Sequence, residues 1–247
     1  MNSTEFFDED EAAEALALDP QFADRFTDQR RPKCQLYLIS PLDVTGDFPD
    51  RLSAALAAGP VAAFQFRVKG MDQHEAARLA EPLLAICRAA DVAFIVNDDV
   101  GLAKRIGADG VHLGQDDGDP REARKILGPE AQIGITVHAS RHLAMSAGEA
   151  GADYIAFGAF HPTTTKQTDH QADPSIIGWW TTVSEIPCVA IGGITAENCA
   201  PIVAAGADFI AVSAGVWAAP DGAGAAVERI HTAMASPAAL RRNSREN

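Results

Sequence analysis

GADYIAFG, residues 151–158, is the stretch that says most about the fold of this chain. Its glycine can close a preceding helix in the left-handed conformation, and the apolar run after it is typical of a buried strand. The same Gly-Ala-Asp triplet begins at Gly107 and at Gly206, again directly before an apolar run. Gly59 stands in the equivalent place earlier in the chain. This recurrence indicates a repeat of about two strand–helix units.

Outward from these triplets, eight short apolar runs alternate with helix-like stretches such as 74–90 and 140–150. Strict alternation predicts right-handed crossovers and a parallel sheet. With the repeat, eight units favour an α/β fold of one (β/α)8 (TIM) barrel. The alternative is an open doubly wound sheet, which would want a glycine-rich turn after the first strand, and residues 39–47 do not supply one. The predicted strands are QLYLIS (35–40), VAAFQFRV (61–68), AFIVND (93–98), GVHLG (110–114), QIGITV (132–137), YIAFGAF (154–160), CVAIGG (188–193) and FIAVSAG (209–215).

The domain organisation follows from where these runs begin and end. The barrel is predicted to occupy residues 34–236. Residues 1–33 form an acidic N-terminal extension, whose pattern allows one amphipathic helix from Asp8 to Leu18. Residues 237–247 are predicted to be a disordered tail, because they are polar and terminal.

Composition excludes several classes of protein. The formal net charge of −14 over 247 residues disfavours binding to a phosphate backbone, so no nucleic-acid partner is expected. No apolar run reaches membrane-spanning length, and the N-terminus lacks the basic and apolar regions of a secretory signal. The four cysteines include no CxxC pair, which suits reduced thiols in a cytoplasmic protein. Small-molecule partners are expected, and a homo-oligomer is left open.

The end of the second predicted strand carries a cluster of polar side chains. Alternation along the strand puts Gln65, Arg67 and Lys69 on one face. Two cations facing inward would be costly to bury without an anionic partner, so the pattern favours an anion site. The alternative is a basic strand end exposed to solvent.

Two aspartates follow each of the next two strands. Asp98 and Asp99 end the third, and Asp116 and Asp117 follow the fourth. Carboxylates at neighbouring strand ends repel each other unless a cation lies between them, and Mg²⁺ commonly takes one or two carboxylates. Helix capping is the alternative, but capping by Asp99 or Asp119 explains one aspartate in each loop and not two.

The remaining strand ends carry hydroxyl groups and glycines. Thr136 and His138 end strand five, and a single histidine there is more often structural than catalytic. The hydroxyls and the lysine of residues 163–166 suit a phosphate, although they also suit a plain polar loop. Gly193 and Ser213, after strands seven and eight, stand where many barrels bind phosphate.

Taken in order, these segments resemble the thiamine phosphate synthase family. The resemblance runs from about residue 35 to residue 217, and each motif is weak alone whereas the ordered set is specific. The matching stretches are QFRVK (65–69), FIVNDDVGLA (94–103), ADGVHLGQDD (108–117), GITVH (134–138), GADYIAFG (151–158), PTTTK (162–166) and VAIGGITAEN (189–198).

The resemblance implies a (β/α)8 barrel transferase that joins 4-amino-2-methyl-5-hydroxymethylpyrimidine pyrophosphate to a thiazole phosphate, giving thiamine phosphate and pyrophosphate. It implies that Asp98 and Asp117 hold Mg²⁺. The residues implied to bind the pyrimidine substrate are Gln65, Arg67, Lys69, Asn97 and Lys166, with Thr136 near the leaving pyrophosphate. Those implied to bind the thiazole phosphate are Thr163, Thr165, Gly193, Ser213 and Ala214. Catalysis would rest on Arg67, Lys69, Thr136 and Lys166.

The chain departs from the family pattern at four positions. Val68 replaces an acidic residue, Thr136 replaces serine, His161 stands where an aromatic residue is common, and Ala214 stands where serine is expected. Two rival functions stay open. A thiazole tautomerase on the same barrel would use His138 as general acid and base, and a non-catalytic phosphate-ligand sensor would have lost catalysis.

Overall fold

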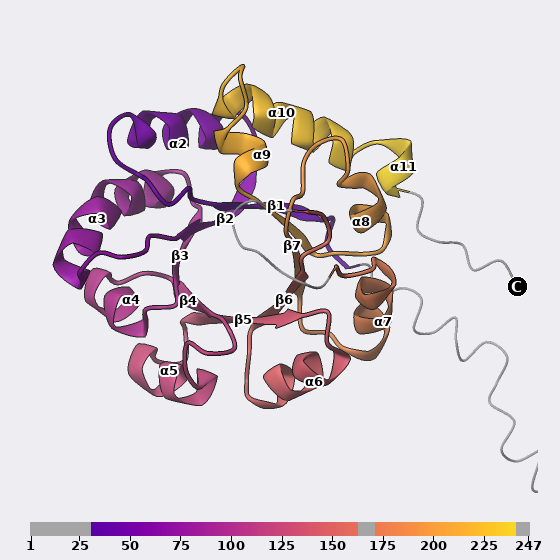
Figure 1. Ribbon diagram of the computed structural model, residues 1–247, viewed down its shortest axis with the longest axis horizontal. Coiled ribbons are helices and arrows are strands. Elements are labelled where there is room, and N and C mark those ends of the chain that lie inside the picture. The colour runs from indigo at the N-terminus through magenta and orange to yellow at the C-terminus, as the bar shows by residue number, and fades with distance from the viewer. Residues whose placement is uncertain (1–30, 163–170, 241–247) are drawn as a thin grey trace, which may run out of the picture. The chain divides into compact units, whose positions relative to one another are not determined.

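The computed structural model describes residues 31–162 and 171–240 and contains a closed barrel of eight parallel strands, arranged in chain order (Figure 1). The barrel closes through pairing of the first strand with the last. All eight predicted strands are confirmed, and the open sheet is excluded. The strands are β1 (Gln35–Ile39), β2 (Val61–Phe66), β3 (Ala93–Asn97), β4 (Gly110–Leu113), β5 (Gln132–His138), β6 (Tyr154–Gly158), β7 (Cys188–Ile191) and β8 (Phe209–Val212).

Helices surround the barrel on its outside (Figure 1). Helices α2 to α8 each connect one strand to the next, as the alternation predicted, and α9 to α11 follow the last strand. None of the described helices combines the length and the apolar character that a bilayer span requires. The helices are α2 (Phe48–Ala57), α3 (Gln73–Ala89), α4 (Val100–Ile106), α5 (Pro120–Leu127), α6 (Arg141–Glu149), α7 (Ser175–Val183), α8 (Ala200–Ala204), α9 (Ala214–Trp217), α10 (Ala223–Met234) and α11 (Pro237–Leu240).

Alternation along the strands divides the buried side chains into two sets. Phe64 and Phe66 of β2 belong to the large core between strands and helices. Tyr37, Ile39 and Tyr154 belong to a smaller cluster that fills the inside of the barrel. Beyond the end of a strand, the residues that continue the alternation of this inner cluster point into the mouth of the barrel. This alternation positions the polar residues at the carboxyl ends of the strands.

The Gly-Ala-Asp triplets close the opposite end of the barrel. Their glycines have the predicted positive φ, with values of 64°, 86° and 100° at Gly107, Gly151 and Gly206. The aspartates have a role that the sequence did not predict, because each accepts a backbone N–H from the strand before its own. The pairs are Asp109 with Phe94 at 2.7 Å, Asp153 with Ile133 at 2.6 Å and Asp208 with Cys188 at 2.9 Å.

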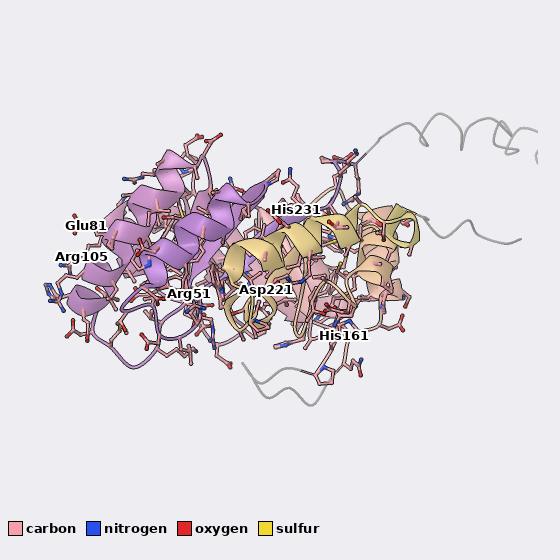
Figure 2. All side chains as sticks on the ribbon, turned by 90° about the horizontal axis from the view of Figure 1, so that it is seen from above. Arg51, Glu81, Arg105, His161, Asp221 and His231 are labelled. Atoms are coloured by element: carbon pink, nitrogen blue, oxygen red, sulfur yellow. The ribbon has the colours of Figure 1, made fainter. Side chains whose placement is uncertain are left out.

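Asp208→Ala is therefore expected to destabilise the barrel, because it leaves the buried N–H of Cys188 without this acceptor. Asp208 is 9% exposed, and a buried donor that loses its partner costs roughly 1–3 kcal/mol. For a domain of this size the midpoint of thermal unfolding should fall by about 2–10 °C. Asp221→Ala, at the surface just before α10 (Figure 2), is the matched control. Equal midpoints for the two variants in circular dichroism would contradict this role.

One predicted boundary is wrong. The disordered tail predicted for residues 237–247 begins too early, because Pro237–Leu240 forms α11, which packs against α8 and contains the buried Ala239. Ser236 accepts the N–H of Ala239 at 3.3 Å at the start of this helix. The rest of the tail and the helix predicted for residues 8–18 lie outside the described residues. Lys33–Asn247 forms one compact unit by itself, and the boundary near residue 33 stays a prediction.

Candidate active site

A cavity of about 360 Å³ opens at the carboxyl ends of the strands. Every predicted site residue that the structure describes lines it, although they come from six different strand ends. These residues are Gln65, Arg67, Lys69, Asn97, Asp98, Asp117, Thr136, Gly193, Ser213 and Ala214. Thr163, Thr165 and Lys166 lie outside the described residues. The sequence therefore predicted which side chains share one cavity, while their roles stay predictions.

The cationic side of the cavity is the end of β2. Ser40 fixes the backbone there, because its hydroxyl accepts the N–H of Arg67 at 2.8 Å and donates to the Arg67 carbonyl at 3.1 Å. The Nη1 atom of Arg67 is buried and has no hydrogen-bond partner among the described residues. Lys69 is more exposed, and its Nζ lies 3.4 Å from Oδ2 of Asp98. A buried guanidinium nitrogen without a partner suits an anionic ligand.

Next to the end of β2, the loops after β3 and β4 each contain one aspartate that caps a helix and another that lines the cavity. Asp99 caps α4 by accepting the N–H of Leu102 at 2.8 Å, and Asp119 caps α5 through the N–H of Arg121 at 2.7 Å. Neither Asp98 nor Asp117 caps a helix, and both line the cavity. Asp98 adopts a φ of 66°, a conformation that asparagine and aspartate tolerate better than most residues.

The Asp117 carboxyl lies close enough to perturb that of Asp98. Burial raises the pKa of Asp98, the neighbouring Asp117 carboxyl raises it further, and the ammonium of Lys69 opposes both effects. Such a pair favours either a shared proton or a cation. Among the described residues no group of three or more histidine, cysteine, aspartate or glutamate side chains gathers to hold a metal. Two hard oxygen ligands nevertheless fit Mg²⁺, which usually completes its shell with water and phosphate oxygens.

At the end of β5, a bulge brings two side chains to the cavity. The pairing with β6 shifts between Thr136 and His138, and both residues line the cavity. His138 has a φ of 51°. The amide of Gln115 donates to the Thr136 carbonyl and holds this segment against the loop after β4. A hydroxyl and an imidazole are therefore presented on the same side of the barrel mouth.

The far side of the cavity contains the glycines after β7 and the start of α9. Gly193 has a φ of 63°, and a Cβ there would come within 2.4 Å of the Pro162 carbonyl oxygen. Glycine is thus required by the neighbouring loop, whether or not a phosphate binds. The hydroxyl of Ser213 donates to the Ser40 carbonyl at 3.4 Å, and Ala214 is exposed beside it.

The structure accounts for one departure from the family pattern, Val68, and leaves His161 without a structural explanation. Val68 packs against the outer core and not into the cavity, so the loss of an acidic residue there leaves the cavity lining unchanged. His161 has a buried Nε2 without a described hydrogen-bond partner, as does His231. Figure 2 shows these two histidines well apart, with His231 on α10.

Sequence reasoning missed three residues inside the barrel. His112 lines the cavity floor and is 5% exposed, and the hydroxyls of Tyr37 and Tyr154 lie 3.0 Å apart beneath it. Each stands in an apolar run, at a position whose alternation points into the barrel. That alternation is the sequence signal for them, and a histidine in the middle of a buried strand indicates a polar group inside the barrel.

Comparison with known proteins gives consistent results. The family model described as Thiamine monophosphate synthase matches residues 36–216. The chain is 69% identical over 187 residues to the thiamine-phosphate synthase of Erythrobacter litoralis, covering 74% of this chain and 88% of that protein. It is 52% identical over 202 residues to that of Rhodospirillum centenum, covering 81% and 98%. A solved thiamine phosphate pyrophosphorylase from Pyrococcus furiosus superposes with a TM-score of 0.72 at 31% identity, covering 82% of this chain and 96% of that one.

Proposed function

The chain belongs to the thiamine monophosphate synthase family, and we propose that its cavity joins a pyrimidine pyrophosphate to a thiazole phosphate. It is a transferase of the thiamine-phosphate synthase type. The observation that carries the proposal is one cavity lined by a carboxylate pair, Asp98 and Asp117, and by Arg67, whose buried Nη1 has no hydrogen-bond partner in the described part of the chain.

The residue types suit a reaction in which a leaving group gathers negative charge. The pyrimidine ring is electron-rich, so the bond between its exocyclic carbon and the pyrophosphate oxygen can break early and leave a delocalised cation. The thiazole nitrogen then bonds to that carbon and pyrophosphate departs. Such a reaction needs no protein nucleophile. It needs donors aimed at the departing oxygens and two substrates held in line.

The described residues supply these donors from two strand ends. Arg67 and Lys69 bind the pyrophosphate, and the Thr136 hydroxyl at the end of β5 donates a hydrogen bond to its bridging oxygen. Mg²⁺, held by Asp98 and Asp117, would neutralise charge on the pyrophosphate oxygens when bound. Asn97 and Gln65 orient the pyrimidine. Gly193, Ser213 and Ala214 line the side proposed for the thiazole phosphate. Thr163 and Thr165, which lie outside the described residues, are proposed to bind the same phosphate, and Lys166 is proposed to bind the pyrophosphate.

The direct test is to incubate the protein with both substrates and Mg²⁺ and to analyse the products by mass spectrometry. Thiamine phosphate should form together with pyrophosphate, and omission of either substrate should abolish both products. Consumption of neither substrate would contradict the proposal. It would leave the non-catalytic sensor as the better interpretation.

His138→Gln is expected to retain most of the coupling activity, within about tenfold, because no protein base is essential when the pyrimidine ionises. A tautomerase would instead need His138 to move a proton, and general acid–base steps contribute roughly 10²- to 10⁴-fold. Both thiamine phosphate formation and thiazole isomerisation should be assayed in the wild type and the variant. Isomerisation that depends on His138, with no coupling in the wild type, would overturn the assignment in favour of the tautomerase.

A cytoplasmic location and small-molecule partners complete the proposal. The cytoplasmic location is supported by the four free cysteines, three of them buried, because free thiols are typical of a reducing compartment. The acidic charge disfavours a nucleic-acid partner.

A further inference from the structure

A continuous row of hydrogen bonds crosses the inside of the barrel beneath the cavity. The amide nitrogen of Gln65 lies 3.1 Å from the Tyr37 hydroxyl, which lies 3.0 Å from that of Tyr154. The Tyr154 hydroxyl lies 3.1 Å from Nδ1 of His112, and Nε2 of His112 lies 2.8 Å from Oγ1 of Thr136. The row therefore links two residues that line the cavity from β2 and β5.

Burial and ring packing hold this row in place. Gln65, Tyr37, His112 and Tyr154 are each at most 8% exposed. The ring of His112 stacks on that of Tyr154 with centroids 5.5 Å apart, and the two tyrosine rings meet edge to face at 6.1 Å. Rings packed in this way have little freedom to rotate, so the hydrogen bonds have defined geometry.

The direction of the row follows from counting donors. The Gln65 nitrogen can only donate, so the Tyr37 oxygen accepts and its proton is available for Tyr154. Tyr154 then donates to Nδ1 of His112, which must be unprotonated. The reverse direction would leave the Tyr37 proton without an acceptor among the described residues. Burial raises the pKa of Tyr37 to about 12 and that of Tyr154 well above its ordinary value, so both hydroxyls keep their protons at neutral pH.

We propose that His112 is a positioning residue, held as the Nε2–H tautomer, whose donation to Thr136 turns the Thr136 proton toward the cavity. Oγ1 of Thr136 accepts the Nε2–H of His112 from inside the barrel, so the Thr136 hydroxyl hydrogen is free to donate toward the cavity. Under the proposed function, on which this step rests, the acceptor is an oxygen of the departing pyrophosphate. With the opposite tautomer, Nδ1–H, Thr136 would donate to Nε2 and offer the substrate only a lone pair.

The tautomer is measured without any substrate, so the result does not depend on the proposed function. Long-range ¹H–¹⁵N correlation spectra of the ¹⁵N-labelled protein distinguish a proton on Nε2 from one on Nδ1. Absence of the signal in His112→Gln assigns it. A neutral ring protonated on Nε2 is expected. A proton on Nδ1, or on both nitrogens, would overturn the proposal.

Kinetics then test whether His112 acts through Thr136. Glutamine can place an amide nitrogen near the position of Nε2, whereas asparagine reaches only that of Nδ1. His112→Asn should lower kcat by roughly 10- to 100-fold with little change in KM, and Thr136→Val should do the same. His112→Gln should restore most of kcat, and the double variant His112→Asn with Thr136→Val should be no slower than either single one.

Two results would contradict the proposal that His112 acts through Thr136. Losses that multiply in the double variant would show independent roles, and a glutamine variant as slow as the asparagine variant would show that Nε2 does not matter. The exposed His142→Gln serves as the control for histidine replacement. Thermal unfolding of each variant verifies that it folds. A wild type that makes no thiamine phosphate would refute the proposed function alone, because the tautomer measurement still decides the direction of the row.

Discussion

Asp98→Ala and Asp117→Ala are each expected to lower kcat/KM by roughly 10³-fold, because each removes a proposed ligand of Mg²⁺. A metal ion contributes several kcal/mol to stabilising charge in a transition state, and about 1.4 kcal/mol corresponds to tenfold in rate. The measurement is turnover as a function of Mg²⁺ concentration. The residual activity of either variant should no longer rise with Mg²⁺ over the range that saturates the wild type.

Asp116→Ala is the matched control, since Asp116 is the exposed neighbour of Asp117 and does not line the cavity. It should keep the activity and Mg²⁺ dependence of the wild type. The pKa of Asp98 is raised, so protons compete with the metal for this carboxylate as the pH falls. The wild type should need more Mg²⁺ as the pH falls. Unchanged activity in Asp98→Ala or Asp117→Ala would show that the metal assignment is wrong.

Arg67→Ala should lower kcat/KM by about 10²- to 10³-fold, the loss expected when a buried donor to developing negative charge is removed. Arg67→Lys should recover only part of this loss, because an ammonium keeps the charge but cannot donate two parallel hydrogen bonds to a phosphate. Calorimetric binding of pyrophosphate should weaken in the same order. Both variants should fold, since Nη1 of Arg67 has no described partner to lose.

Arg105→Ala is the control for loss of a surface arginine. Arg105 lies in the last turn of α4 (Figure 2) and does not line the cavity. If Arg67→Ala bound pyrophosphate as tightly as this control, the anion site would have to be assigned to other residues.

The parts of this fold that depend on local periodicity were predictable from the sequence. Apolar runs of strand length gave all eight strands, and alternation placed Gln65 and Arg67 toward the barrel mouth and Phe66 toward the helices. The loops that contain two aspartates each also predicted a site, because the start of a helix needs only one capping aspartate and the other must have a different role. That reasoning separated Asp98 from Asp99, and the structure has Asp99 as the cap.

What was not predictable depends on the alignment of distant strands. The hydrogen bonds among Tyr37, His112 and Tyr154 join residues separated by 42 and 117 positions, and their existence depends on the register around the closed barrel. The aspartates of the Gly-Ala-Asp triplets likewise bind a neighbouring strand. Helix α11 was missed because a helix of this length is marginal alone and is stabilised by packing on α8.

Calorimetry with pyrophosphate, with and without Mg²⁺, tests most directly the claim that the two carboxylates and the end of β2 form one site for magnesium pyrophosphate. The wild type should bind pyrophosphate much more tightly when Mg²⁺ is present, and Asp98→Ala should lose that enhancement while keeping weak binding through Arg67. Equal binding with and without Mg²⁺, or no binding at all, would contradict the account.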